Sequence, residues 1–225
     1  MICLGGDLTV WFITGASRGL GAEIARQALE CGDSVSVTAR DVRGVMARFE
    51  QYGSRVPMSE LDVTKEEEVD RAVAATLDRF GRIDVLMNNA GRGLIGAVEE
   101  ADAKEVLAAF DTNVFGMLAV ARGVLPIMRR QCAGRVLNVS SIGGFAKAPG
   151  WGIYGATKFA VEGISEALHG ELAPLGIDVL IVEPGSFRTD FLDGRSLQRA
   201  ARTIDDYADT AGRVRDYVGC AITTR

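Results

Sequence analysis

Histidine is nearly absent from this sequence, and closely spaced cysteine pairs are absent altogether. The 225 residues include one histidine, His169, and four cysteines, Cys3, Cys31, Cys132 and Cys220, none of which forms a Cys-x-x-Cys pair. Metal-dependent alcohol dehydrogenases, Ser/His/Asp hydrolases and His-based hydroxy-acid dehydrogenases each need a well-placed histidine. We therefore expect no metal site, free thiols, and a position on a helix surface for His169.

A strong charge of one sign and membrane-length apolar runs are also missing. The formal net charge is −5, and the basic residues are scattered among acidic ones, which argues against a nucleic-acid partner. The longest apolar stretches are interrupted well short of the roughly 20 residues that a membrane span requires. Residues Met1–Leu8 do not have the basic and then apolar pattern of a secretory signal. We expect a cytoplasmic protein with a small-molecule partner and no membrane or nucleic-acid partner.

The apolar content of 48% fits one compact domain over residues 1–225. Strand-like and helix-like stretches alternate along it, which predicts a parallel, doubly wound α/β sheet of the Rossmann type. Its strands would lie in the order 3-2-1-4-5-6, with the ligand crevice above strands one and four. The expected strands are Thr9–Thr14, Ser34–Ala39, Arg55–Leu61, Val85–Asn88, Arg135–Val139 and Asp178–Glu183.

Helices are predicted from apolar spacing and from start signals. Residues Ala22–Cys31 have helical spacing, and another helix is expected from about Gly152 to Leu172. Thr64 with Glu67, and Asp102 with Glu105, have the spacing of capping boxes that begin two more helices. The charged stretch Ser196–Val218 also looks helical.

A glycine-rich turn, Thr14-Gly-Ala-Ser-Arg-Gly-Leu-Gly21, joins the first strand to the first helix. Glycines at this place let the backbone approach a pyrophosphate that lies at the helix N-terminus. Such a turn could also serve only as a tight connection between strand and helix. Its position between a strand and a helix favours nucleotide binding.

Tyr154 and Lys158 are four residues apart at the start of a predicted helix, so their side chains share one face. A free tyrosine is protonated at neutral pH and can act as an acid, and a nearby ammonium group would favour its phenolate. Ser141 ends the fifth strand, at the sheet edge where the crevice is expected. Taken singly, each feature has an ordinary structural interpretation as an amphipathic surface pair or a turn residue. Ser140 is an alternative to Ser141.

The glycine spacing G-x-x-x-G-x-G and five later motifs together resemble the classical type of the short-chain dehydrogenase/reductase family, over roughly Val10–Thr189. The later motifs are Asn88-Asn-Ala-Gly91, Asn113, Ser141, Tyr154-Gly-Ala-Thr-Lys158, and Pro184-Gly185 with Thr189.

The resemblance implies hydride transfer between a nicotinamide cofactor and a carbonyl or secondary alcohol. Tyr154 would be the proton donor, with Lys158 beside it, and Ser141 would hydrogen-bond the reacting oxygen. The family's spacing of serine to tyrosine selects Ser141 over Ser140, and strand alternation points its neighbour the other way. Asn113 resembles the family's helix-interrupting asparagine, which would hold a water that links Lys158 to solvent.

NADP(H) is favoured over NAD(H) because the second strand ends in Ala39-Arg40 instead of an acidic residue. Arg18 could supply a second guanidinium to the 2′-phosphate, although Asp41, one position further on, keeps NAD(H) possible. By resemblance, Asp62 and Val63 border the adenine, Asn88 and Gly91 back the ribose, and Thr189 holds the carboxamide. The full set of expected cofactor contacts is Gly15, Ser17, Arg18, Gly19, Leu20, Gly21, Arg40, Asp62, Val63, Asn89, Ala90, Gly91, Tyr154, Lys158, Pro184, Gly185 and Thr189.

The residues expected around the substrate are mostly apolar, which suits a hydrophobic ketone, aldehyde or secondary alcohol. Some of them could instead only pack the lid loop, and residues 186–218 are expected to form this substrate loop and lid. The expected substrate residues are Ile142, Gly143, Phe145, Ala148, Trp151, Phe187, Phe191 and Leu192, with Arg188 as the polar exception.

The sequence ends at Arg225, whereas classical family members usually continue into a seventh strand. We therefore expect this strand to be missing, which leaves open a redox-inactive dinucleotide-binding sensor or scaffold as the alternative to an enzyme. The helices from Asp102 and Gly152 could pair into a homodimer, and a tetramer is left open.

Overall fold

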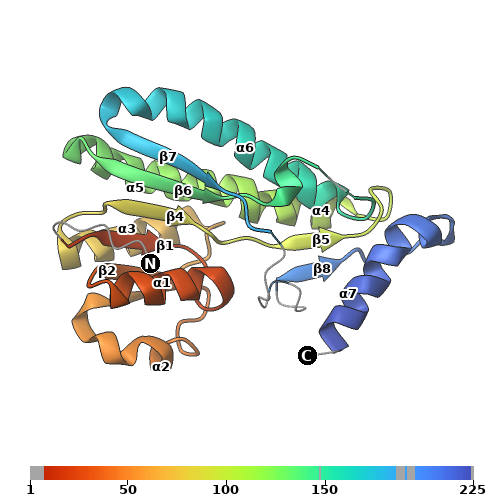
Figure 1. The fold of residues 1–225 in the computed structure, drawn as a ribbon, viewed down its shortest axis with the longest axis horizontal. Helices are drawn as coiled ribbons and strands as arrows, with labels where there is room; N and C mark the ends of the chain where they lie inside the picture. The colour runs from red at the N-terminus through yellow and green to blue at the C-terminus, as the bar shows by residue number, and fades with distance from the viewer. Residues whose placement is uncertain (1–7, 147, 186–190, 192–195, 224–225) are drawn as a thin grey trace.

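A parallel sheet of six strands forms the centre of the molecule (Figure 1). The computed structural model describes residues 8–146, 148–185, 191 and 196–223, with the backbone alone described for 219–223. The strand order β3-β2-β1-β4-β6-β7 confirms the predicted doubly wound topology. These strands are β1 (Val10–Ile13), β2 (Ser34–Ala39), β3 (Met58–Glu60), β4 (Val85–Asn88), β6 (Gly134–Val139) and β7 (Ile177–Val182).

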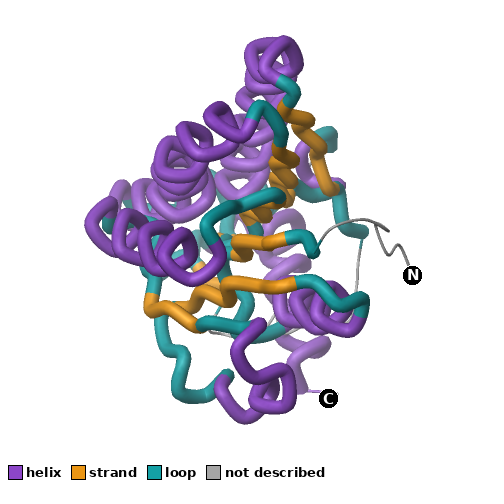
Figure 2. Tube along the Cα trace, turned by 90° about the vertical axis from the view of Figure 1, so that its left-hand side faces the viewer, coloured by secondary structure: helices purple, strands orange, loops and turns teal. Residues whose placement is uncertain are grey.

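Helices cover both faces of this sheet, as Figure 2 shows from the side. Neighbouring β1 side chains point to opposite faces, so Phe12 packs against one helical layer and Ile13 against the other. The Phe12 layer contains α3 (Glu66–Phe80), α5 (Gly116–Gln131) and the end of α6 (Gly152–Leu172), and the Ile13 layer contains α1 (Gly19–Glu30) and α2 (Met46–Phe49).

Two predicted helix starts have different outcomes. The box of Asp102 and Glu105 is confirmed at the start of α4 (Ala103–Phe110), where both reciprocal hydrogen bonds are present. The box of Thr64 and Glu67 is wrong, because α3 begins at Glu66 without a side-chain cap. The Thr64 hydroxyl instead donates to Asp62 Oδ1 at 2.7 Å. A nearby carboxylate has thus replaced the helix N-terminus as the partner of this hydroxyl.

A second, two-stranded sheet lies beyond the carboxyl edge of the main sheet (Figure 1). It pairs β5 (Gly93–Ile95) with β8 (Leu197–Arg199) in parallel, and it precedes α7 (Arg213–Thr223). The prediction of a helix over Ser196–Val218 is therefore wrong in its first part. The two strands have three residues each and lie about 100 residues apart in the sequence. Strands this short show no alternating pattern from which the sequence could predict them.

The thiol expectation also needs a correction, since Cys31 takes part in a disulfide bond. Cys132 carries a free, exposed thiol, and His169 lies exposed on α6 as predicted.

The helical run Ala103–Gln131 is long and apolar enough to cross a membrane by composition. However, Val120, Val124 and Met128 of this run are buried in the core beneath the sheet, which is the packing of a core helix.

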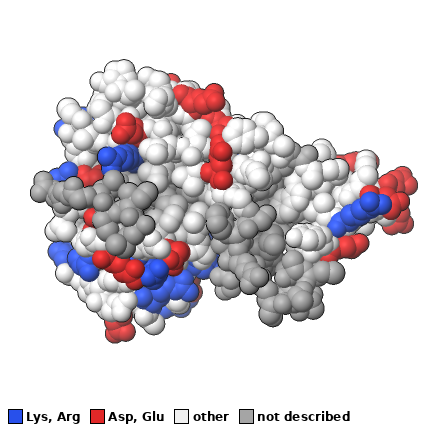
Figure 3. Space-filling model, in the orientation of Figure 1, with Lys and Arg blue, Asp and Glu red and all other residues white. Residues whose placement is uncertain are grey.

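Charges of both signs are interspersed on the molecular face drawn in Figure 3. Most of the ion pairs among the described residues are between exposed side chains, such as Arg122 with Glu66 and Arg43 with Asp41. Exposed pairs contribute about 0–1 kcal/mol each to stability. The fold therefore depends mainly on its two apolar layers and on buried hydrogen bonds.

One buried hydrogen-bonded chain joins the sheet to α6. Asn88 Nδ2 donates to Asn138 Oδ1 at 2.9 Å, and Asn138 Nδ2 donates to Ser165 Oγ at 2.9 Å. All three residues are buried, and Asn138 is fully so. A buried amide that loses its partner costs the free energy of removing it from water.

Replacing Asn138 with the similarly sized leucine should therefore lower the free energy of unfolding by about 1–3 kcal/mol, because Asn88 and Ser165 each lose a partner. Urea unfolding followed by circular dichroism measures this loss. Arg135→Leu, on the same strand but with a half-exposed side chain, is the control and should change stability by about 0.5 kcal/mol or less. Equal effects of the two changes would contradict this account.

Candidate active site

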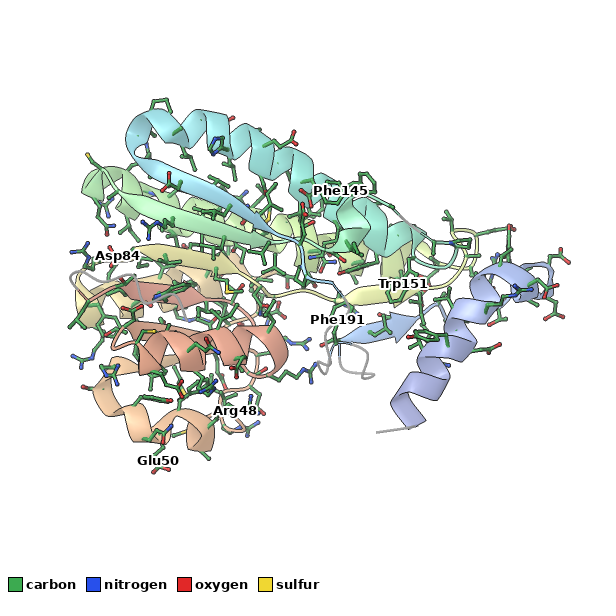
Figure 4. The ribbon with its side chains drawn as sticks, in the orientation of Figure 1. Arg48, Glu50, Asp84, Phe145, Trp151 and Phe191 are labelled. Carbon is green, nitrogen blue, oxygen red and sulfur yellow. The ribbon has the colours of Figure 1, made fainter. Side chains whose placement is uncertain are left out.

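A cavity of about 910 Å³ opens at the carboxyl ends of β1, β4 and β6. Figure 4 shows Trp151 and Phe191 near this end of the sheet, whereas Asp84 lies at the opposite end. Most of the predicted site residues meet here. The predicted residues that line the cavity are Gly15, Ser17, Arg18, Gly19, Leu20, Arg40, Asp62, Val63, Asn89, Ala90, Gly91, Ser141, Tyr154, Lys158, Pro184 and Gly185.

Some predicted residues do not line this cavity. Gly21 packs on the side chain of Asn89, and Asn113 is buried behind the wall. Asn88 points into the sheet toward Asn138 and does not line the cavity, whereas Asn89, which is also among the expected contacts, does line it. Thr189 lies outside the described residues.

The glycine-rich turn is locked to the turn after β4. Thr14 Oγ1 accepts hydrogen bonds from the backbone nitrogens of Asn89 and Ala90, both at 3.0 Å. In return, Asn89 Nδ2 donates to the carbonyl oxygens of Thr14 and Gly15 at 2.9 Å. A Cβ on Gly21 would lie 2.4 Å from this amide nitrogen, which explains glycine at that position. Thr14 was not among the predicted site residues, although it stands directly before the first glycine.

The start of α1 has the features of a phosphate site. Arg18 is the N-cap residue of this helix, but its side chain forms no capping hydrogen bond. The first turn of the helix contains no acidic side chain. The backbone N–H groups and the positive end of the helix dipole therefore remain available to an anion, and Ser17, Gly19 and Leu20 line the cavity there. Gly15 has a φ of +65°, which favours glycine at the beginning of the turn. This cradle fits the pyrophosphate of a nicotinamide dinucleotide.

The end of β2 contributes Arg40 to the cavity, with its side chain exposed. Asp41 does not line the cavity and is paired with Arg43, with Arg43 Nε 3.0 Å from Asp41 Oδ1. Burial alone would raise the pKa of Asp62, but hydrogen bonds from Thr64 and the charge of Arg40 outweigh it and hold this pKa below its ordinary value. One cation and one carboxylate thus border the same end of the cavity.

The Tyr154 phenol is buried in the cavity wall, with 7% of the residue exposed. Burial raises its pKa, and a hydrogen bond with the Ser141 side chain offsets only part of this effect. The ammonium nitrogen of Lys158 lies 5.8 Å from the centre of the Tyr154 ring and donates to the Val139 carbonyl at 2.8 Å. In the structure as it stands, the phenol is therefore protonated at neutral pH and can donate a proton.

The two serines at the end of β6 have different partners. Ser141 faces Tyr154, and its Oγ also accepts from the backbone nitrogen of Gly143 at 3.1 Å. Ser140 turns away and donates to the Glu162 carboxylate on α6. A Cβ on Gly144 would lie 2.5 Å from this carboxylate, so the turn packs tightly against α6. The geometry thus brings Ser141, and not Ser140, to the phenol.

Asn113 lies in a π-helical turn, Asp111–Phe115, which interrupts the run from α4 to α5. Its Nδ2 donates to Arg92 O and to Thr157 Oγ1, both at 2.9 Å. Thr157 is fully buried and donates to the Tyr154 carbonyl at 2.7 Å. Thr157 therefore connects Asn113 to the helical turn that carries Tyr154, a role that its place within the motif did not indicate. The water relay expected at Asn113 stays a prediction.

Aromatic and aliphatic side chains form the rest of the wall. The rings of Trp151 and Phe191 each have their centres 5.7 Å from that of Tyr154. Ile142 and Ala148 line the cavity as expected, but Gly143 and Phe145 do not, and Phe187, Arg188 and Leu192 lie outside the described residues. Sequence reasoning assigned residues 186–218 to a substrate loop and lid but did not single out the α7 residues that line the cavity, which are Arg213, Val214, Tyr217 and Val218.

Comparison with known proteins matches residues 9–200 to the family model described as short chain dehydrogenase. The chain is 44% identical to oxidoreductase BOA17 of Botryotinia fuckeliana over 204 residues, which cover 90% of this chain and 74% of that protein. It is 43% identical to a 3-ketodihydrosphingosine reductase of Bacteroides thetaiotaomicron over 198 residues, which cover 88% and 71% of the two chains.

Solved structures have the same fold. A short-chain dehydrogenase from Streptomyces avermitilis is 42% identical, with a TM-score of 0.89 over 95% of this chain and 78% of that one. An enzyme of the same class from Burkholderia phymatum, in complex with NAD, is 29% identical and has a TM-score of 0.80 over 84% and 69% of the chains. ElxO with NADP bound is 30% identical, with a TM-score of 0.78 over 83% and 77%.

Replacing Thr157 with valine should lower the free energy of unfolding by about 1–3 kcal/mol, because the Asn113 amide and the Tyr154 carbonyl each lose a buried partner. Thermal and urea unfolding measure this change. Thr157→Ser keeps the hydroxyl and is the matched control, which should retain most of the stability. A valine variant as stable as the unaltered protein would contradict the role assigned to the hydroxyl.

Proposed function

Because the chain belongs to the short-chain dehydrogenase/reductase family of NAD(P)-dependent oxidoreductases, we propose that it reduces a hydrophobic ketone or aldehyde with NADPH. The observation that carries this proposal is the buried Tyr154 phenol, with Ser141 and Lys158 beside it, in the same cavity as the glycine-rich turn. A redox-inactive sensor is not favoured, because Ser141, Tyr154 and Lys158 are assembled around one point.

Each residue has a distinct task in this reaction. A nicotinamide cofactor held at the glycine-rich turn would supply the hydride to the carbonyl carbon. Tyr154 transfers its phenolic proton to the carbonyl oxygen, where negative charge develops. Ser141 hydrogen-bonds the same oxygen and orients it beside the phenol. Lys158 places a positive charge near the phenolate that remains, and this charge favours its formation.

The NADP(H) preference is supported by the end of β2. Arg40 borders the cavity, and a guanidinium suits bidentate contact with the 2′-phosphate. Asp41, which could favour NAD(H), is engaged by Arg43 outside the cavity lining. Related structures hold NAD in one case and NADP in another. The preference for NADP(H) is therefore proposed from the residues of this chain.

A hydrophobic substrate is supported by the walls beside Tyr154. Trp151 and Phe191 stand next to the phenol, and Val214 and Val218 extend the apolar surface. Similarity to a 3-ketodihydrosphingosine reductase supports a keto compound as the class of substrate. We propose reduction as the natural direction, in which Tyr154 acts as the proton donor.

A homodimer is also proposed. Large apolar side chains at Leu107, Phe115 and Phe159 are about half exposed on the helical surface of α4, α6 and the π-helical turn between α4 and α5. Pairing of these helices between two copies would cover them. The cytoplasmic location and the absence of membrane and nucleic-acid partners stay predictions.

Tyr154→Phe should lower kcat/KM for an aromatic ketone by about a hundred- to ten-thousandfold, because the proton donor is removed while the ring remains. The decrease of reduced-nicotinamide absorbance measures turnover. Binding of NADPH, followed by tryptophan fluorescence, should be largely retained, because the other cofactor contacts remain. Full turnover by the phenylalanine variant would sink the assigned role of Tyr154, and cofactor binding without turnover by the unaltered protein would favour the sensor.

Arg40→Ala should weaken NADPH binding by about ten- to a hundredfold and leave NADH binding nearly unchanged, because only NADPH has the 2′-phosphate. Fluorescence titration with both nucleotides gives the two dissociation constants. Arg48→Ala is the control, since Arg48 is exposed on α2 away from the cavity (Figure 4). An unchanged ratio of the two constants in Arg40→Ala would contradict the proposed preference.

A further inference from the structure

A buried carboxylate outside the cavity, Glu100, has no part in the reaction described above. Its side chain has no exposed surface, yet it forms an ion pair with Arg215, whose side chain is 14% exposed. Glu100 also accepts hydrogen bonds from the backbone nitrogens of Ala97 at 2.7 Å and Ile204 at 2.9 Å. A buried charge is costly unless it is paired and hydrogen-bonded. These three partners hold the pKa of Glu100 below its ordinary value despite burial, which would raise it.

The partners of Glu100 come from three segments that meet beyond the main sheet. Ala97 follows β5, Ile204 follows β8, and Arg215 belongs to α7. Gly96, with a φ of +153°, brings the first two segments into contact, since a Cβ there would lie 2.7 Å from the Ala200 Cβ. The carboxylate is thus a buried polar group of the region that carries α7, which lies beyond β5 and β8 in Figure 1.

The other side of α7 forms a wall of the cavity. Val214 and Val218 pack with Trp151 in a small apolar cluster, and Tyr217 also lines the cavity. Trp151 in turn stacks edge-on against Tyr154, with ring centres 5.7 Å apart. The position of α7 therefore determines how much apolar surface a substrate meets beyond the phenol. Glu100 and Arg215 themselves do not line the cavity.

We propose that Glu100 is a positioning and specificity-determining residue, which holds α7 through Arg215 and so sets the affinity for extended apolar carbonyl substrates. This inference rests on the proposed function. A short ketone would react at Tyr154 without reaching α7, whereas a long one would bury part of its chain against Val214, Tyr217 and Val218. Each methylene group buried there contributes about fourfold to binding.

The test compares butanone with methyl nonyl ketone, using NADPH and the complete chain. In Glu100→Gln and in Arg215→Lys, the KM for methyl nonyl ketone should rise by roughly tenfold, which corresponds to loss of contact with about two methylene groups. The KM for butanone, both kcat values and the dissociation constant of NADPH should change less than about twofold. Glu66→Gln removes the exposed ion pair with Arg122 and is the matched control, with no expected change.

A merely structural role predicts a different result. Loss of folded protein would lower kcat for both ketones equally and leave both KM values unchanged, and this outcome would overturn the inference. Tyr217→Ala removes part of the wall directly and should reproduce the selective rise in KM. The combination with Glu100→Gln should then raise KM less than the product of the two single effects. If Glu100→Gln does not fold, Arg215→Lys and Tyr217→Ala decide the question, and normal KM values in both would refute it.

The failure of the proposed function can be told apart from the failure of this inference. If the unaltered protein reduces neither ketone, the proposed function fails. Methyl nonyl ketone is then titrated into the NADPH complex while the fluorescence of Trp151 and Trp11 is followed. Roughly tenfold weaker binding to Glu100→Gln than to the unaltered protein would still support the role of Glu100, and equal binding would reject it.

Discussion

The hydrogen bonds between Thr14 and Asn89 are the constraint on which the site depends. They join the carboxyl ends of β1 and β4, the two strands between which the order of the sheet reverses. After β1 and after β4 the chain turns to opposite faces of the sheet, which leaves a crevice between the two turns. The hydrogen bonds keep these two turns close together. The Asn89 amide fills the space that a Cβ on Gly21 would occupy. One side chain thus both closes the turns and positions the phosphate cradle at the start of α1.

The chemistry at the other end of the crevice depends on a balance between burial and hydrogen bonding. Burial favours the neutral form of Tyr154, and the Ser141 hydroxyl only partly offsets it. The Lys158 ammonium donates to the Val139 carbonyl and lies over the Tyr154 ring, 5.8 Å from its centre. Thr157 and Asn113 add rigidity behind these groups. The phenol is consequently prepared as an acid before any substrate arrives.

Local patterns in the sequence predicted the main sheet and most cavity residues, because alternating strands and helices and short motifs carry their own spacing. They failed where two arrangements fit the same pattern. Thr64 with Glu67 has the spacing of a capping box as much as Asp102 with Glu105, but Asp62 competes for the Thr64 hydroxyl. Both Asn88 and Asn89 were expected at the cofactor, but Asn88 points into the sheet toward Asn138 and only Asn89 faces the cavity. These outcomes depend on tertiary contacts between distant residues, which a short stretch of sequence does not contain.

The substrate half of the site was the least predictable, because its contacts join distant parts of the chain. The strands β5 and β8 have three residues each and pair across about 100 residues, so neither has a periodic signal. Glu100 looks like an ordinary surface acid in an acidic stretch, and only the approach of Ile204 and Arg215 makes it a buried anchor. The cofactor half is therefore built on the sheet, whereas the substrate half also includes α7, which Glu100 contacts through Arg215. A change in that region can alter which carbonyl compounds fit while the nucleotide cradle and the phenol keep their positions.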